Sequence, residues 1–158
     1  KNYFFNALKI AAENYCLSKK YDKIKVIRLS NLYGMNFSNQ VYLLPSLIRN
    51  SKRYKKIDIT INKKSKKNYL NVIDAINIAL KIIDKSKYRI YNIASNQRIS
   101  LEKIATNIQK ATNCKIKYVN QKKIFNEPII DISRVKKEFN FKPKNNFQNL
   151  ISKIIKKY

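Results

Sequence analysis

The chain has 158 residues, 44% of them hydrophobic, which fits one folded domain and excludes the depleted composition of a disordered chain. Its formal charge is +26, from 35 Lys and Arg against 9 Asp and Glu. Histidine is absent, and Cys16 and Cys114 fit no metal-ligand spacing, so zinc chemistry, histidine-based acid–base catalysis and a disulfide framework are disfavoured.

The hydrophobic pattern predicts alternating helices and strands in the first half of the chain. Apolar residues recur every three or four positions over residues 3–20, which is typical of an amphipathic helix. The β-branched run at 24–29 indicates a buried strand. A second helix is predicted over 42–53, with Pro45 in its first turn, and alternation over 57–61 indicates a half-buried strand.

The second half continues the same alternation, which favours an α/β fold. Helices are predicted over 74–84 with Asp74 as N-cap, from Ser100 to about 111, from 131 or 133 to about 140, and over 146–158. Strands are predicted over 89–93 and 116–119.

Six short strings follow one another along the chain: KIAAE from Lys9, RLSNLYG from Arg28, NYLNVID from Asn68, YNIAS from Tyr91, DISR from Asp131 and EFNFKP from Glu138. Each string alone is weak, but the series resembles the C-terminal half of the NAD-dependent epimerase/dehydratase family of extended short-chain dehydrogenases. That family carries S-K-x-x-x-E, R-x-x-N-x-Y-G, R-D-Y-x-x-V-x-D, Y-N-I-x-S and D-x-S-K followed by L-G-W-x-P. The resemblance covers nearly the entire chain.

The resemblance implies the last strands and the active-site helix of a Rossmann-type sheet, over 1–34 and 71–95. It also implies a small α/β substrate-binding subdomain over 35–70 and 96–158. A Rossmann cofactor site needs a glycine-rich turn, whereas Gly34 is the only glycine, placed where a turn would use its tolerance of positive φ. We therefore expect the N-terminal dinucleotide-binding half to be absent and the isolated chain to bind NAD(P) poorly. The first residue is Lys1, which favours a chain that begins inside a longer reading frame.

Lys9 corresponds to the lysine of the family's Y-x-x-x-K helix, which holds the nicotinamide ribose. Residues four apart share a helix face, so that ammonium can also lower the pKa of the tyrosine phenol, the family's general base. The position four before Lys9 is Phe5, which has no proton to exchange. This departure puts catalysis in doubt, but not the fold.

Two tyrosines on the same helix could replace the missing phenol. Tyr3 is two positions from Phe5 and points to another side of the helix. Tyr15 and Lys19 have the right spacing, but Lys19 lies nine positions before Arg28, too few to end the helix and cross the sheet. We predict Tyr15 to be a core aromatic.

By resemblance, four further residues complete the site. Ser30 and Asn31, at the end of a strand, would contact the cofactor, and Asn31 also the sugar. Lys67 stands where the family commonly has an arginine facing the nucleotide diphosphate, and supplies charge without the bidentate fork. Asn92 would position the substrate. A turn without ligand at Asn31, and an asparagine that satisfies backbone groups at Asn92, are the simpler alternatives.

The full-length protein would thus epimerise or dehydrate a nucleotide-diphosphate sugar with NAD(P), and we expect it in the cytoplasm, with a homodimer contact through the first helix. No apolar run reaches the roughly 18 residues that span a membrane.

A catalytically inactive member of the same fold is the leading alternative because of Phe5. A basic nucleic-acid-binding domain ranks lower, since the charge is mostly lysine spread evenly along the chain, as an AT-rich genome would give.

Overall fold

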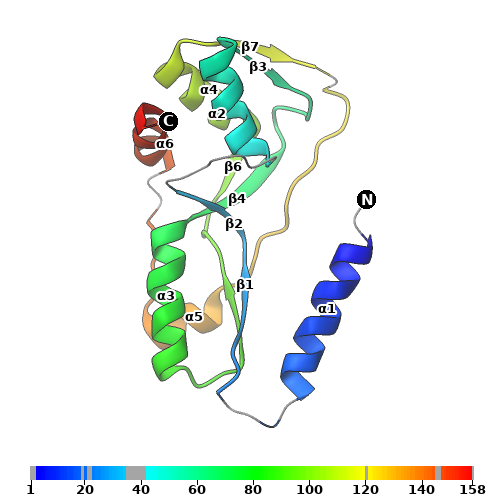
Figure 1. Ribbon diagram of the computed structural model, residues 1–158, viewed down its shortest axis with the longest axis vertical. Helices are drawn as coiled ribbons and strands as arrows, with labels where there is room; N and C mark the ends of the chain where they lie inside the picture. Colours follow the sequence, from blue (N-terminus) through cyan, green and yellow to red (C-terminus); the bar gives the residue numbers. More distant parts are fainter. Residues whose placement is uncertain are drawn as a thin grey trace.

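The computed structural model describes residues 3–18, 20, 23–34, 42–119, 121–144 and 147–157. Within them helices and strands alternate, as predicted for an α/β chain (Figure 1). The helices are α1 (Tyr3–Ser18), α2 (Leu43–Arg53), α3 (Val72–Lys85), α4 (Leu101–Thr112), α5 (Ser133–Phe139) and α6 (Phe147–Lys157). The strands are β1 (Val26–Leu29), β2 (Asn31–Tyr33), β3 (Lys56–Ile59), β4 (Lys66–Asn71), β5 (Ile90–Ile93), β6 (Arg98–Ser100) and β7 (Lys115–Tyr118). None of these helices is long and apolar enough to cross a membrane.

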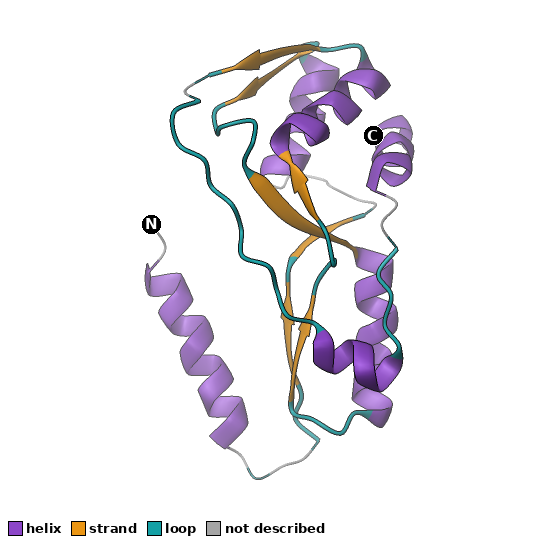
Figure 2. Cartoon of the chain, turned by 180° about the vertical axis from the view of Figure 1, so that it is seen from behind, coloured by secondary structure: helices purple, strands orange, loops and turns teal. Residues whose placement is uncertain are grey.

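The strands form three small sheets along the length of the molecule. β1 pairs in parallel with β5, and β3 pairs in parallel with β7. Between these pairs, β4 runs parallel to β2 and antiparallel to β6. A long segment connects β7 to α5 and runs down the molecule, and its described residues, 119 and 121–132, form no helix or strand (Figure 2). The sequence pattern predicted the four strands of the outer pairs but not the central sheet.

Two separate hydrophobic cores hold these layers together, and β4 contributes to both. The upper core lies among α2, α4, α6, β3 and β7, and includes Tyr33, Tyr69, Ile108 and Phe147. The lower core, among α3, α5 and β5, includes Leu70, Ile82 and Tyr91. Side chains alternate across a strand, so the neighbours Tyr69 and Leu70 enter different cores.

The helix starts confirm one predicted cap and correct another. The Ser100 side chain caps α4 by accepting a hydrogen bond from Lys103 N, as predicted. At α3, however, the cap is Asn71, whose Oδ1 accepts from Ile73 N at 2.9 Å. Asp74 lies within the first turn, is buried, and accepts from Lys144 N at 2.7 Å. It therefore ties α3 to the segment that precedes α6.

Helix α1 forms as predicted, but it has no buried residue. Tyr15, expected in the core, is 65% exposed. Polar contacts hold the helix beside β1. Arg28 Nε donates to Glu13 Oε2 at 2.9 Å, and this hydrogen bond lowers the pKa of Glu13. Arg89 donates to the carbonyls of Cys16 and Leu17 in the last turn of the helix. The Glu13 and Arg28 positions of the family pattern thus meet in space.

Gly34 is required for a different reason from the predicted one. Its φ is not positive, so the backbone itself would accept another residue. A Cβ at this position, however, would lie 3.1 Å from Val72 Cβ and overlap Val72 Cγ1. The absence of a side chain therefore lets the end of β2 approach the start of α3.

Gly34→Ala is accordingly expected to lower the free energy of unfolding by about 1–3 kcal/mol, the usual cost of overpacking. Urea denaturation followed by circular dichroism measures this change. Val72→Ala removes the overlapping methyl groups. In that background, Gly34→Ala should therefore lower the free energy of unfolding by less than it does in the wild type. Equal losses from Gly34→Ala in both backgrounds would contradict this close-contact explanation.

Candidate functional site

A cavity of about 630 Å³ lies between α1, the β1–β2 junction, the start of α2 and β4. Four of the six predicted site residues line it: Lys9, Ser30, Asn31 and Lys67. They come from α1, the β1–β2 junction and β4, so the fold brings together positions up to 58 residues apart in sequence. Lys9 and Lys67 bring two ammonium groups to this cavity and Glu127 brings one carboxylate, which leaves a net positive charge that suits an anionic ligand.

Phe5 and Lys9 lie on one face of α1, as their four-residue spacing predicts. The Lys9 Nζ atom is 4.7 Å from the centroid of the Phe5 ring, a cation–π distance. The phenyl ring therefore lies beside the ammonium where a phenol would be needed for proton exchange. Phe5 is about half exposed and is not among the cavity-lining residues.

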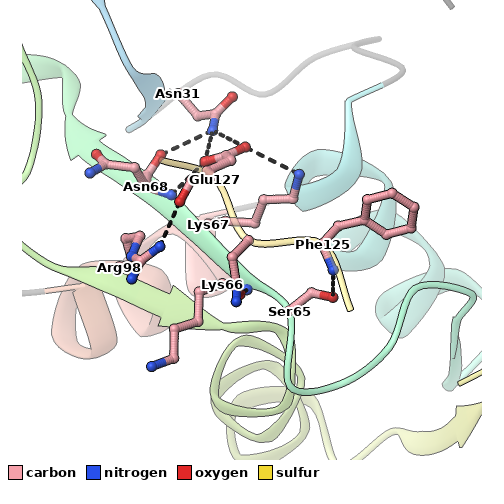
Figure 3. Close-up of polar contacts among 9 residues, drawn as sticks. Asn31, Ser65, Lys66, Lys67, Asn68, Arg98, Phe125 and Glu127 are labelled. Atoms are coloured by element: carbon pink, nitrogen blue, oxygen red, sulfur yellow. Dashed lines mark hydrogen bonds and ion pairs between the residues drawn. The ribbon is translucent and has the colours of Figure 1, made fainter. Parts of the chain in front are cut away.

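Glu127 also lines the cavity and organises its polar residues (Figure 3). Its carboxylate accepts hydrogen bonds from Asn31 Nδ2 at 3.0 Å and from the backbone nitrogen of Asn68 at 2.6 Å. It also forms an ion pair with Lys67 Nζ at 3.1 Å. The side chains of Lys67 and Glu127 are 23% and 28% exposed, so this pair is screened less than a surface pair.

The backbone of the segment that carries Glu127 is fixed to β4, to Arg98 of β6 and to Ser65, which precedes β4. Glu127 N donates to Lys66 O at 3.0 Å, and Arg98 Nη1 donates to Glu127 O at 2.7 Å. Phe125 N donates to the Ser65 hydroxyl at 2.8 Å. Sequence analysis missed Glu127, because it lies 60 positions after Lys67 in a segment without hydrophobic periodicity.

Ser30 is held at the cavity wall by its backbone, since Ser30 N donates to Ile93 O at 3.1 Å. Its hydroxyl oxygen is buried and has no hydrogen-bond partner within the described ranges. A buried hydroxyl without a partner is costly, so this oxygen is suited to a contact with a bound group.

Asn92, the sixth predicted residue, does not line the cavity. It lies within β5, paired with Arg28 of β1, and its Nδ2 donates to the Asp131 carbonyl at 3.1 Å. This matches the simpler alternative of an asparagine that satisfies the backbone, here at the start of α5. The substrate role of Asn92 stays a prediction.

Two tyrosines pack beside the site. Tyr69 lines the cavity, and its ring packs 6.5 Å from that of Tyr33 and 5.8 Å from that of Phe147. Burial raises the pKa of both phenols, that of Tyr33 to about 12. Both therefore stay protonated well above neutral pH.

The raised pKa of Tyr33 predicts a loss of stability in alkali. An unfolded tyrosine ionises near pH 10, whereas folded Tyr33 keeps its proton up to about pH 12. Between these values the unfolded state releases a proton that the folded state retains, so stability falls as the pH rises. Tyr33→Phe should show a shallower fall than the wild type in urea denaturation between pH 9 and 11.5. The exposed control Tyr42→Phe should match the wild-type slope, and equal slopes for all three proteins would contradict the prediction.

A known protein family and several solved structures are similar to this chain. The model of the NAD dependent epimerase/dehydratase family matches residues 2–94. No curated protein matches.

Several solved structures have a similar fold. UDP-N-acetylglucosamine 4-epimerase from Methanobrevibacter ruminantium M1, in complex with UDP-N-acetylmuramic acid, is 19% identical with a TM-score of 0.80, over 95% of this chain and 51% of that chain. The dTDP-glucose 4,6-dehydratase from Bacillus anthracis, in complex with NAD, is 21% identical with a TM-score of 0.76, over 94% and 48%. UDP-N-acetylglucosamine 4-epimerase from Bacillus cereus is 23% identical with a TM-score of 0.74, over 93% and 53%. The chain thus spans about half the length of these structures, and its fold matches that part of them.

Proposed function

Because the chain belongs to the NAD dependent epimerase/dehydratase family, we propose that it supplies the substrate-binding part and a share of the active site of an NAD(P)-dependent enzyme that epimerises or dehydrates a nucleotide-diphosphate sugar. The observation that carries the proposal is the cavity that gathers Lys9, Ser30, Asn31 and Lys67. The Lys67 ammonium suits a diphosphate, the Asn31 carboxamide suits a sugar, and Lys9 and Ser30 suit the nicotinamide ribose. The solved structures of similar fold include complexes with UDP-glucose.

The residues present fit only the nicotinamide end of a dinucleotide. Lys9 would hold the ribose, and the partnerless Ser30 hydroxyl oxygen at the cavity wall would make a second contact. When bound, the cofactor supplies a reversible hydride acceptor. The described residues contain no glycine-rich turn for the pyrophosphate, since Gly34 is the only glycine of the whole sequence.

Phe5 supports a second candidate function, a binding member of the family that does not catalyse. The ring beside Lys9 cannot accept a proton from a sugar hydroxyl, so the usual base is missing. Assays of several nucleotide sugars with the intact protein, with and without Phe5→Tyr, separate the two functions. Turnover in the unmodified protein would exclude the binding-only function. Turnover gained only with Phe5→Tyr would support it.

We expect the 158-residue chain to bind UDP-glucose, and Lys67→Ala to weaken the binding about tenfold. The substitution removes a charge-assisted contact to the diphosphate and leaves the Glu127 carboxylate unopposed in the cavity. Isothermal titration calorimetry at low salt measures the affinity. The matched control is Lys110→Ala, which removes the same charge from the exposed surface of α4. Absence of binding, or equal weakening by both substitutions, would contradict the proposal.

A further inference from the structure

The geometry points to Glu127 as a positioning residue. We infer that it fixes the Asn31 carboxamide so that the cavity presents a hydrogen-bond acceptor, selecting ligands that carry a hydroxyl at this point. The inference deepens the proposed function and rests on it for the identity of the ligand. Glu127 itself is assigned no proton transfer and no direct contact with the ligand.

The orientation of the Asn31 amide follows from its surroundings. Asn31 Nδ2 lies 3.0 Å from Asn68 O and 3.0 Å from each oxygen of the Glu127 carboxylate. All three neighbours are acceptors, and the two carboxylate oxygens carry negative charge. A flipped amide would place the Asn31 oxygen against all of them and would lose every hydrogen bond. The Asn31 nitrogen is therefore directed toward Asn68 and Glu127.

This orientation decides what Asn31 offers to a ligand. An amide nitrogen carries two hydrogens, and both are used by the acceptors of Asn68 and Glu127. The Asn31 oxygen points away from these partners (Figure 3), and Asn31 is an exposed, cavity-lining residue. The oxygen accepts from a hydroxyl but repels a phosphate oxygen. Recognition of the diphosphate is thereby left to Lys67.

Glu127 is rigid enough to impose this choice. Its backbone is bonded on both sides, to Lys66 O and to Arg98 Nη1, and its carboxylate bridges Asn68 N and Lys67 Nζ in addition to Asn31. Removal of the carboxylate leaves Asn68 O as the remaining acceptor for the Asn31 nitrogen. The amide can then rotate and offer either end to a ligand.

A measurement without ligand tests the positioning directly. In nuclear magnetic resonance spectra of the free chain, the Asn31 side-chain amide protons should exchange with solvent at least fivefold more slowly than those of the exposed Asn77. Glu127→Ala should abolish this protection, and Glu127→Gln, which keeps one acceptor oxygen, should retain part of it. Glu102→Ala, which removes a carboxylate from the surface pair with Lys63, is the control and should leave it unchanged. Protection that survives Glu127→Ala would overturn the inference.

A second experiment compares UDP-glucose with UDP, which lacks the glucose hydroxyls. We expect the wild-type chain to prefer UDP-glucose about fivefold, the effect of one neutral hydrogen bond. Asn31→Ala and Glu127→Ala should each abolish the preference, and the double variant should lose no more than either single variant. Glu127→Gln should keep most of the preference.

The two outcomes that contradict these expectations are distinguishable. If Asn31→Ala abolishes the preference while Glu127→Ala preserves it, the positioning role is overturned and the proposed function stands. If the wild-type chain binds neither UDP-glucose nor UDP, the proposed function fails, and with it the ligand selection assigned to Asn31.

Discussion

Replacing Ile108 by alanine is expected to lower the free energy of unfolding by about 2–5 kcal/mol, the usual cost of a cavity left by a truncated core isoleucine. Ile108 is fully buried on α4 in the upper core, where α2, α4 and α6 meet. The remaining side chains cannot close the space, because protein cores are packed as densely as organic crystals. Urea denaturation followed by circular dichroism gives the change.

The matched control is Ile83→Ala on α3, where the same side chain is 67% exposed. It should change the free energy of unfolding by less than about 0.5 kcal/mol, as surface substitutions generally do. Similar losses at Ile83 and Ile108 would mean that the upper core is not packed around α4 as described.

Asn68→Ala is expected to lower the free energy of unfolding by about 2–4 kcal/mol through the loss of two buried hydrogen bonds rather than through a cavity. The buried Asn68 side chain donates to Ser95 O at 2.9 Å and accepts from Ser95 N at 3.1 Å, so it bonds both polar groups of one buried residue. Alanine removes both hydrogen bonds to the loop between β5 and β6, and the loss of a bond at a buried polar group costs about 1–3 kcal/mol. Thermal denaturation gives the loss.

Hydrogen exchange distinguishes this mechanism from general destabilisation. The amide of Ser95 should lose its protection in Asn68→Ala under conditions where the centre of α4 stays protected. Asn77→Ala, at an exposed position of α3, is the control and should behave as the wild type. Uniform loss of protection across the chain would contradict the local explanation.

Periodicity predicted the elements that have one clear apolar face and missed those that do not. The helices over 42–53 and 100–111 and the strand over 89–93 agree with α2, α4 and β5 within one or two residues. β2, β4 and β6 were missed, because β2 and β6 have three residues each and β4 begins with two lysines. β4 contributes side chains to a hydrophobic core on each of its faces. The alternation of apolar and polar residues that marks a half-buried strand is therefore absent.

The site residues could be predicted only where they belong to the short sequence strings that match the family pattern. The spacing of Lys9, Asn31 and Lys67 within the family pattern predicted residues that the fold does bring to one cavity. Glu127 carried no such signal, because its role depends on a segment without regular structure lying against β4. Asn92 is a position where the pattern left two readings: its amide nitrogen donates to the Asp131 carbonyl, as the simpler alternative has it, and its substrate contact stays a prediction.

The contribution of β4 to two cores also limits how this part of the chain can evolve. One residue inserted or deleted within Lys66–Asn71 would turn every following side chain to the opposite face, so that Tyr69 and Leu70 would exchange cores. An aromatic ring and a leucine do not fill the same space, so both halves of the molecule would be disrupted at once. Length changes among homologues should therefore be confined to connections outside this strand, while the length of β4 stays constant.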